Sequence, residues 1–226
     1  MTRSLFALLA LTLAAGPAAA ADPPGTRYYF LLFGGQSVPF KPRTGHTWAT
    51  WAKATPTGAG PVMVESFTIS WLPPDGRVHP WRLRSGPGHN FTLDETLAIM
   101  ARENSQVSVW GPFEVDANRY ALACLQAASL DTGGVRFRSF DSLGRNRDVM
   151  HCVHAVTFAD PAVSRYRQPV LRVGEPGTSS LAEKYLRSGA FVGGAATHDW
   201  LIPALGLDRH AVIRRAPGEA IPREWR

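Results

Sequence analysis

Hydrophobic and polar positions alternate along the first third of the chain in the manner of β-strands. An aromatic and aliphatic run over residues 28–33 closes at two glycines, which predicts a buried strand. β-Branched and aromatic residues over 46–52 predict a second strand. Alternation over 62–72 predicts a third, which ends at the turn sequence Pro73-Pro74-Asp75-Gly76. Because short turns join these runs, we expect an antiparallel meander.

Two later segments have helical periodicity. Thr92, followed three residues later by Glu95, predicts a capping box that opens a helix over 93–102, with an apolar stripe at Leu93, Leu97 and Met100. Asp116 predicts the cap of a second helix over 117–130. Residues 149–158 fit either a strand or a helix. The other predicted elements are strands at 107–113, 135–140 and 170–173, irregular loops at 78–90 and 144–148, a turn at Gly174-Glu175-Pro176-Gly177, and a helix over 180–187.

This order of elements predicts an α+β fold. We expect a mostly antiparallel sheet covered on one face by the helices at 93–102, 117–130 and around 150. No internal repeat or domain boundary is visible, so residues 22–226 are expected to form a single domain. The tail from about residue 216, which contains two prolines and a glycine, is expected to be poorly ordered.

The first 21 residues have a different character. A cationic start, the apolar run Leu5–Leu13 and a closing series of alanines are typical of a secretory signal peptide. The apolar run is shorter than the roughly 20 residues that cross a bilayer. We therefore expect a secreted or periplasmic protein with no integral membrane segment after signal cleavage.

Composition narrows the class of protein and of partner. With 226 residues, 45% hydrophobic and 19% charged, the chain is neither disordered, collagenous nor a disulfide miniprotein. Lys and Arg number 24 against 18 Asp and Glu, but the arginines are scattered and form no block. We expect no nucleic-acid partner. The excess positive charge favours solubility and attraction to an anionic envelope surface.

The sequence Met150-His151-Cys152-Val153-His154 carries the densest candidate chemistry, with three interpretations. In the first, His151 and His154 bind a metal, and Cys152, His198 or Asp199 completes the site. No Cys-x-x-Cys or His-Glu-x-x-His accompanies them, so we predict no metal and no cofactor. In the second, Cys152 is structural: it is simply buried, or export permits a Cys124–Cys152 disulfide.

In the third interpretation, Cys152 is a nucleophile whose pKa is lowered by the start of a helix. The base would then come from elsewhere in the chain. We select His46, which follows Gly45 at the mouth of a predicted strand, because a strand end aims an imidazole precisely enough for catalysis.

Gly45-His46-Thr47-Trp48-Ala49 on an early strand, followed far downstream by His151-Cys152-Val153-His154-Ala155, resembles the circularly permuted papain-like hydrolases, the group of lecithin retinol acyltransferase and bacterial cell-wall peptidases. The resemblance covers residues 27–160. It implies a histidine on a strand of an antiparallel sheet and a cysteine at the start of a helix packed on that sheet.

Carried over, the resemblance makes His46 the general base and Cys152 the nucleophile, with a backbone N–H at the helix start donating to the oxyanion. The residue that orients the histidine would lie on the next strand, where we select Glu65 from Glu65, Ser66, Thr68 and Ser70. His151 departs from the pattern, which has a small polar residue such as asparagine before the cysteine.

The resemblance therefore implies an exported thiol hydrolase or acyltransferase-like protein that acts on an amide or ester, with cell-wall peptide or an acyl compound as substrate. Two alternatives remain at this point. One is a non-catalytic secreted domain, held by the Cys124–Cys152 disulfide, that binds a partner or a wall polymer. The other is a sugar-binding surface built from Trp48, Trp51, Trp71, Trp81 or Trp110.

Overall fold

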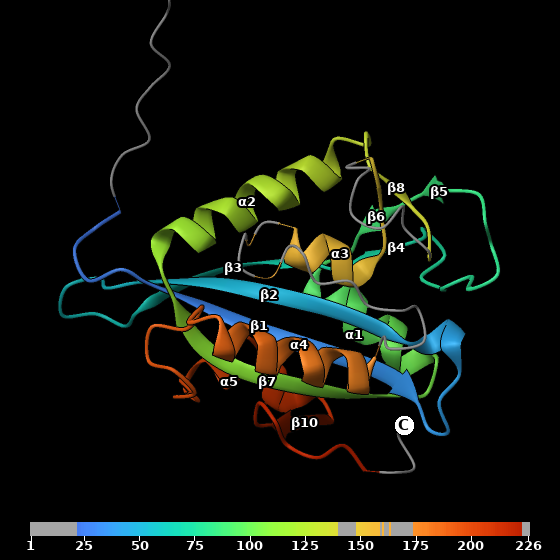
Figure 1. Cartoon of the computed structure of the whole chain (residues 1–226). Helices are drawn as coiled ribbons and strands as arrows, with labels where there is room; N and C mark the ends of the chain where they lie inside the picture. Colours follow the sequence, from blue (N-terminus) through green and yellow to red (C-terminus); the bar gives the residue numbers. More distant parts are fainter. Residues whose placement is uncertain (1–21, 140–147, 159, 161–162, 164–173, 223–226) are drawn as a thin grey trace, which may run out of the picture.

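The computed structural model describes residues 22–139, 148–158, 160, 163 and 174–222. The α+β class is confirmed, with a mostly antiparallel sheet and helices packed beside it (Figure 1). The predicted signal peptide at 1–21, the strand predicted at 170–173 and most of the loop predicted at 144–148 lie outside the described residues.

A five-stranded sheet in the order β10-β7-β1-β2-β3 forms the centre of the fold. Neighbouring strands are antiparallel except β10 and β7, which are parallel. β1 lies in the middle, which is why its long hydrophobic run is buried almost throughout. The strands are β1 (Arg27–Ser37), β2 (His46–Thr55), β3 (Met63–Ile69), β7 (Ser105–Val115) and β10 (Val212–Arg215).

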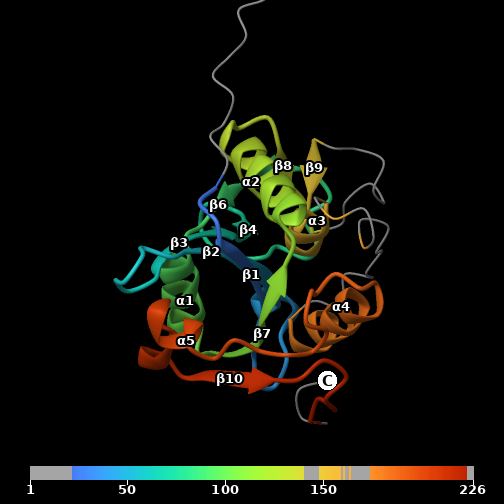
Figure 2. The same cartoon turned by 90° about the vertical axis from the view of Figure 1, so that its left-hand side faces the viewer.

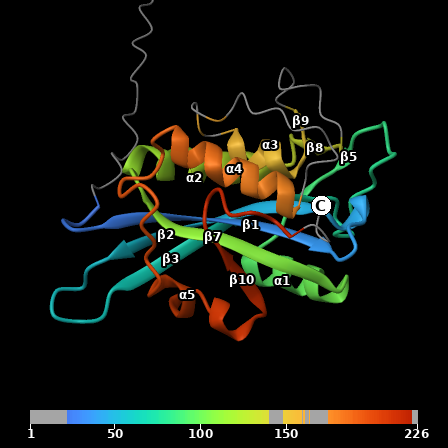
Figure 3. The same cartoon turned by 60° about the horizontal axis from the view of Figure 1, so that its bottom comes forward.

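Helices cover both faces of this sheet rather than the single face that the sequence predicts (Figures 2 and 3). On one, which we call the α1 face, lie α1 (Leu93–Arg102), α5 (Leu201–Ala204) and the 3-10 turn Leu207–Arg209. On the other, which we call the α4 face, lie α2 (Ala117–Asp131), α3 (Cys152–Thr157) and α4 (Glu175–Arg187). Periodicity shows that a helix has an apolar side but not which face of the sheet receives it.

The two larger of the three hydrophobic clusters follow from the alternation of side chains along each strand. The predicted α1 stripe is confirmed in part, because Leu97 and Met100 are buried against Phe33 and Trp48. The predicted capping box of Thr92 and Glu95 is also present. On the α4 face the cluster includes Phe30, Leu32, Trp51, Val153, Val156 and Tyr185.

Small sheets occupy one end of the molecule. The predicted strand at 62–72 divides: β3 stops at Ile69, and β4 (Trp71–Leu72) pairs instead with β6 (His89–Asn90). Residues 149–158 contain both of the predicted forms, β9 (Val149–Met150) and then α3. β9 pairs with β8 (Arg136–Phe137), which in turn pairs with β5 (Gly86–Pro87).

The described residues of the C-terminal segment contact the rest of the domain. Ile221 is buried and belongs to the α4-face cluster. Arg215 forms an ion pair with Glu219, which also accepts a hydrogen bond from the backbone N–H of Ala216.

Candidate functional site

His46 begins β2, as predicted, and points to the α1 face. Its Nε2 lies 2.9 Å from the hydroxyl of Ser70, and its ring stacks on Trp48. Ser70 lies 2.7 Å from the hydroxyl of Thr96 on α1. His46, Ser70 and Thr96 thus form a polar chain inside an otherwise apolar layer.

The environment of His46 keeps its imidazole neutral. The side chain is 1% exposed, and burial lowers its pKa from 6.5 to about 3. Ser70 is equally buried. A serine beside a neutral histidine is the contact from which nucleophilic catalysis starts. Both side chains of this pair are buried in the described structure.

Cys152 begins α3 and belongs to the hydrophobic cluster of the α4 face, with Ala49 and Trp51 of β2. It is 3% exposed. His151 caps the helix, because its Nδ1 accepts a hydrogen bond from the backbone N–H of His154. The histidine that departs from the papain-like pattern therefore has a local role at the helix start.

The structure does not bring His46 and Cys152 together, because the sheet lies between them. Successive side chains of a strand point to opposite faces. Thr47 points to the α4 face, where its hydroxyl lies 2.8 Å from that of Thr178 on α4, and His46 points to the other. The hydrolase hypothesis stays a prediction, and the described geometry gives Cys152 no base at His46.

Glu65 does not orient His46. It lies opposite Lys53 in the register of β2 and β3 and forms an ion pair with that lysine at 3.1 Å. Its side chain is more than half exposed. The neighbour that does contact His46 is Ser70, which was among the residues of this strand that the sequence offered.

The two cysteines are free thiols and do not form the disulfide considered above. Cys124 lies on α2 and is partly buried, and Cys152 lies on α3. Burial raises the pKa of the Cys124 thiol. The hypothesis of a non-catalytic binding domain therefore no longer includes the Cys124–Cys152 disulfide. Its binding role stays a prediction.

The tryptophans do not build a sugar-binding surface together. Trp48, Trp51, Trp71 and Trp110 are buried in the two clusters. Trp81 alone among the five is exposed, in the loop before β5.

A cavity of about 490 Å³ lies along β3, one of the two edge strands of the sheet. Both helical layers contribute to its walls, since α2 belongs to the α4 face and α1 and α5 to the α1 face. The lining residues are Val64, Ser66, Phe67 and Thr68 of β3, Asn90 to Asp94 at the start of α1, Ala127 and Asp131 of α2, and Ala204 and Leu205.

The backbone of β3 directs polar groups into this cavity. The side-chain amide of Asn90 donates to the carbonyl of Thr68 at 3.1 Å and accepts from the N–H of Ser70 at 2.9 Å. In an antiparallel strand every second residue directs both backbone groups away from its partner. The backbone groups of Ser66 and Val64 therefore point outward as those of Thr68 do.

The Asn90 side chain covers the end of the β3 edge near Thr68 and Ser70. Its amide pairs with β3 as a neighbouring strand would, and the N–H of Phe91 bonds the carbonyl of Ser70. Within the described ranges no strand pairs with the outer side of β3 from Val64 to Ser66. An edge of this kind can pair with a further strand. Its rim carries the acidic side chains of Asp94 and Asp131.

Glu175 is a buried carboxyl that the sequence did not reveal. It lies in the first turn of α4, where its backbone N–H donates to Gln36, and its side chain is fully buried. Burial raises its pKa to about 7, against smaller lowering effects of Ser108 and Arg215. The signal was available: Pro176 beside Glu175 marks a helix start as readily as a turn.

The metal interpretation finds no support in the described part of the chain, which contains no group of three or more His, Cys, Asp or Glu placed to hold an ion. His198 lies near Glu114, and Asp199 pairs with Arg214.

No helix among the described residues combines the length and apolar character needed to cross a membrane. No protein-family model, curated protein or solved structure matches the chain.

Proposed function

We propose that this protein binds an extended peptide with a cationic side chain, which adds as a further strand to the open edge of β3. The observation that carries the proposal is the pairing of Asn90 with Thr68 and Ser70. An amide group already satisfies one end of the edge, and the same backbone groups continue into the cavity. A peptide strand would satisfy them in the same way.

The side chains around the edge favour the same occupant. Phe67, Phe91 and Leu205 give the cavity apolar walls for alternate side chains of a strand. Asp94 and Asp131 favour a positive charge at the rim. A cell-wall peptide with a free side-chain amine belongs to this class, and export, as expected from residues 1–21, would bring the protein to it.

A substitution at Ser66 tests the backbone pairing directly. The N–H of Ser66 points outward, so Ser66→Pro removes an edge donor and leaves the bonds between β2 and β3 intact. Ser66→Ala is the matched control, because it keeps the N–H. We expect Ser66→Pro to raise the Kd at least about tenfold and Ser66→Ala to change it little.

The measurement is fluorescence anisotropy with a labelled hexapeptide of alternating valine and threonine that carries one lysine. Methylation of its backbone nitrogens at alternate positions should abolish binding in one register only. Asp94→Asn and Asp131→Asn should weaken binding in a salt-dependent way, and Glu183→Gln on α4 should not. Equal Kd values for the two Ser66 variants, or no binding of the peptide, would contradict the proposal.

A further inference from the structure

The loop between β4 and β5 displays the most exposed large hydrophobic side chains among the described residues. Trp81 is 85% exposed and Leu83 is 76% exposed. Two large apolar side chains this exposed within three residues make the loop a candidate for contact with a partner or a membrane. We call residues 81–84, with the sequence Trp-Arg-Leu-Arg, the loop tip.

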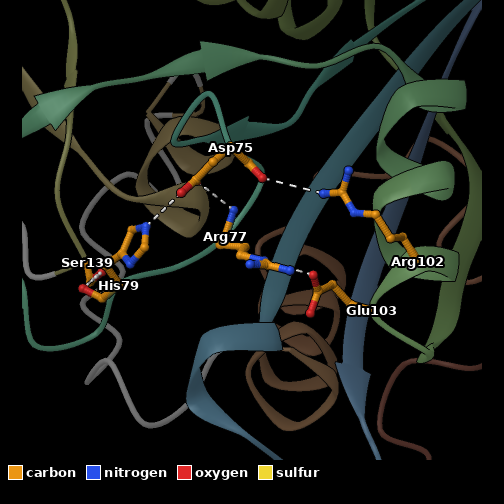
Figure 4. A network of polar contacts seen from close by, with 6 residues as sticks. All are labelled: Asp75, Arg77, His79, Arg102, Glu103 and Ser139. Atoms are coloured by element: carbon orange, nitrogen blue, oxygen red, sulfur yellow. Dashed lines mark hydrogen bonds and ion pairs between the residues drawn. The ribbon is translucent and has the colours of Figure 1, made fainter.

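The base of this loop is held in place by the polar network in Figure 4. Arg77 pairs with Glu103 at the end of α1, at 3.0 Å. Asp75 accepts from the backbone N–H of Arg77 and contacts the ring of His79 at 2.9 Å. Further bonds run from Arg102 to the carbonyl of Asp75 and from Ser139 to the carbonyl of His79. The tip therefore projects from an anchored base.

Positive charge surrounds the two apolar side chains. Arg82 and Arg84 alternate with them along the tip, and both are exposed. A shallow hollow beside the tip is lined in part by Arg82 and Arg84, and no aspartate or glutamate is among its described lining residues. Arg136 adds a further charge and is bonded to the carbonyl of Ser85 at 2.9 Å.

We propose that the loop tip is a membrane anchor that binds an anionic phospholipid surface. Trp81 and Leu83 enter the headgroup region, where an indole is favoured because one side is apolar and the N–H stays solvated. Arg82 and Arg84 pair with lipid phosphates. A soluble anionic polymer would use the arginines alone, whereas the exposed tryptophan and leucine fit an acyl boundary. The proposal is independent of peptide binding at β3.

Sedimentation with vesicles tests the anchor. The full chain should bind vesicles that contain phosphatidylglycerol and should bind vesicles of phosphatidylcholine alone far less. The double variant Arg82→Gln with Arg84→Gln should lower the partition coefficient roughly thirtyfold. The double variant Trp81→Ala with Leu83→Ala should lower it at least about tenfold.

Two controls keep the result specific. Leu125→Ala removes an equally accessible leucine on α2, which is 68% exposed, and should leave binding unchanged. Trp81→Phe should keep most of the binding but abolish the blue shift of tryptophan emission that accompanies it.

Failure to bind phosphatidylglycerol vesicles would overturn the proposal. So would binding that is unaffected by loss of Trp81 and Leu83. Equally tight binding to soluble polyphosphate that depends only on the arginines would show a polyanion site in place of a membrane anchor.

Discussion

The two faces of the central sheet each bury a titratable side chain, and burial acts on them in opposite directions. On the α1 face His46 has its pKa lowered to about 3. On the α4 face Glu175 has its pKa raised to about 7. Both effects arise because a buried charge loses its hydration, which disfavours the protonated base and the ionised acid alike.

The comparison shows that similar burial has different consequences near neutral pH. The protonation state of His46 does not change there, whereas that of Glu175 does. His46 stays neutral throughout the physiological range and is bonded to Ser70. The pKa of Glu175 is raised to about 7, and its Oε2 forms an ion pair with Nε of Arg215 at 3.9 Å. The α4 face therefore contains a carboxyl whose protonation changes near neutral pH.

The two groups also oppose each other in the pH dependence of stability. From pH 4.5 to 6.5 the unfolded chain protonates His46 and ionises Glu175, whereas the folded chain does neither. Stability rises with pH where the unfolded state binds more protons. His46 therefore makes stability rise over this range and Glu175 makes it fall, so the two contributions cancel.

The largest expected effect on the pH dependence of the free energy of unfolding comes from removing His46. In the wild type, the His46 contribution falls as pH drops from 6.5 to 3, by roughly 4 to 5 kcal/mol in total. His46→Gln keeps a polar group beside Ser70 but lacks this loss. Urea unfolding from pH 3.5 to 7.5 should show the variant gaining on the wild type as pH falls. The exposed His210→Gln is the control, and a pH-independent difference would contradict the buried neutral imidazole.

Removing the Glu175 carboxyl should change the pH dependence of stability in the opposite direction. The Glu175 contribution is present below pH 4.5 and is lost as pH rises to about 7, by roughly 3 kcal/mol. Glu175→Gln should therefore gain stability relative to the wild type over that range, measured by the same urea titrations. Glu183→Gln, on the same helix, should follow the wild type. A gain that appears only below pH 4.5 would reverse the assigned direction.

Substitution of two neighbouring glycines, Gly34 and Gly35, tests how tightly side chains pack on each face of the sheet. A Cβ at Gly34 would lie 2.7 Å from the hydroxyl of Thr178 and 3.2 Å from the backbone of Gly174, on the α4 face. A Cβ at Gly35 would lie 2.5 Å from the sulfur of Met100 and 3.1 Å from the ring of Trp48, on the α1 face. Since a thioether moves more easily than a branched side chain or a backbone, Gly34→Ala should cost about 2 to 3 kcal/mol and Gly35→Ala about 1 kcal/mol. Thermal unfolding of both variants would show the order, and the reverse order would contradict it.

The smallest expected effect tests whether the sheet separates His46 from Cys152. His46→Gln should leave the rate of Cys152 alkylation in the folded protein unchanged, because the two side chains lie on opposite faces. Cys124, which is less buried, should react first. Mass spectrometry after timed treatment with iodoacetamide measures both rates. Fast alkylation of Cys152 at neutral pH that is lost in the variant would restore the hydrolase hypothesis.

Local features of the fold could be predicted because their causes are local. The capping box of Thr92 and Glu95 and the apolar spacing of Leu97 and Met100 define α1 from within ten residues. Glu175 was missed for a related reason: a glycine and a proline beside it fit both a turn and a helix start, and burial by β1 decides between them.

The candidate site could not be predicted in the same way. His46 and Thr47 differ by one position, and in a strand one position exchanges the two faces. The papain-like pattern placed a histidine and a cysteine in the right order along the chain, but order carries no information about faces. Asn90 reaches the end of the β3 edge because β6, to which it belongs, pairs with β4 directly after β3. Spacing in the sequence does not reveal that pairing.

By itself, the sequence determined the α+β class, the mostly antiparallel sheet and the positions of the main strands and of α1 and α2, because propensity, caps and periodicity act over a few residues. Only the tertiary structure decided which face each helix covers, that His46 meets Ser70, that Glu175 is buried, and that β3 is an open edge beside a cavity. Those outcomes depend on contacts between segments that are distant along the chain, and the free energy of those contacts is set by burial and register.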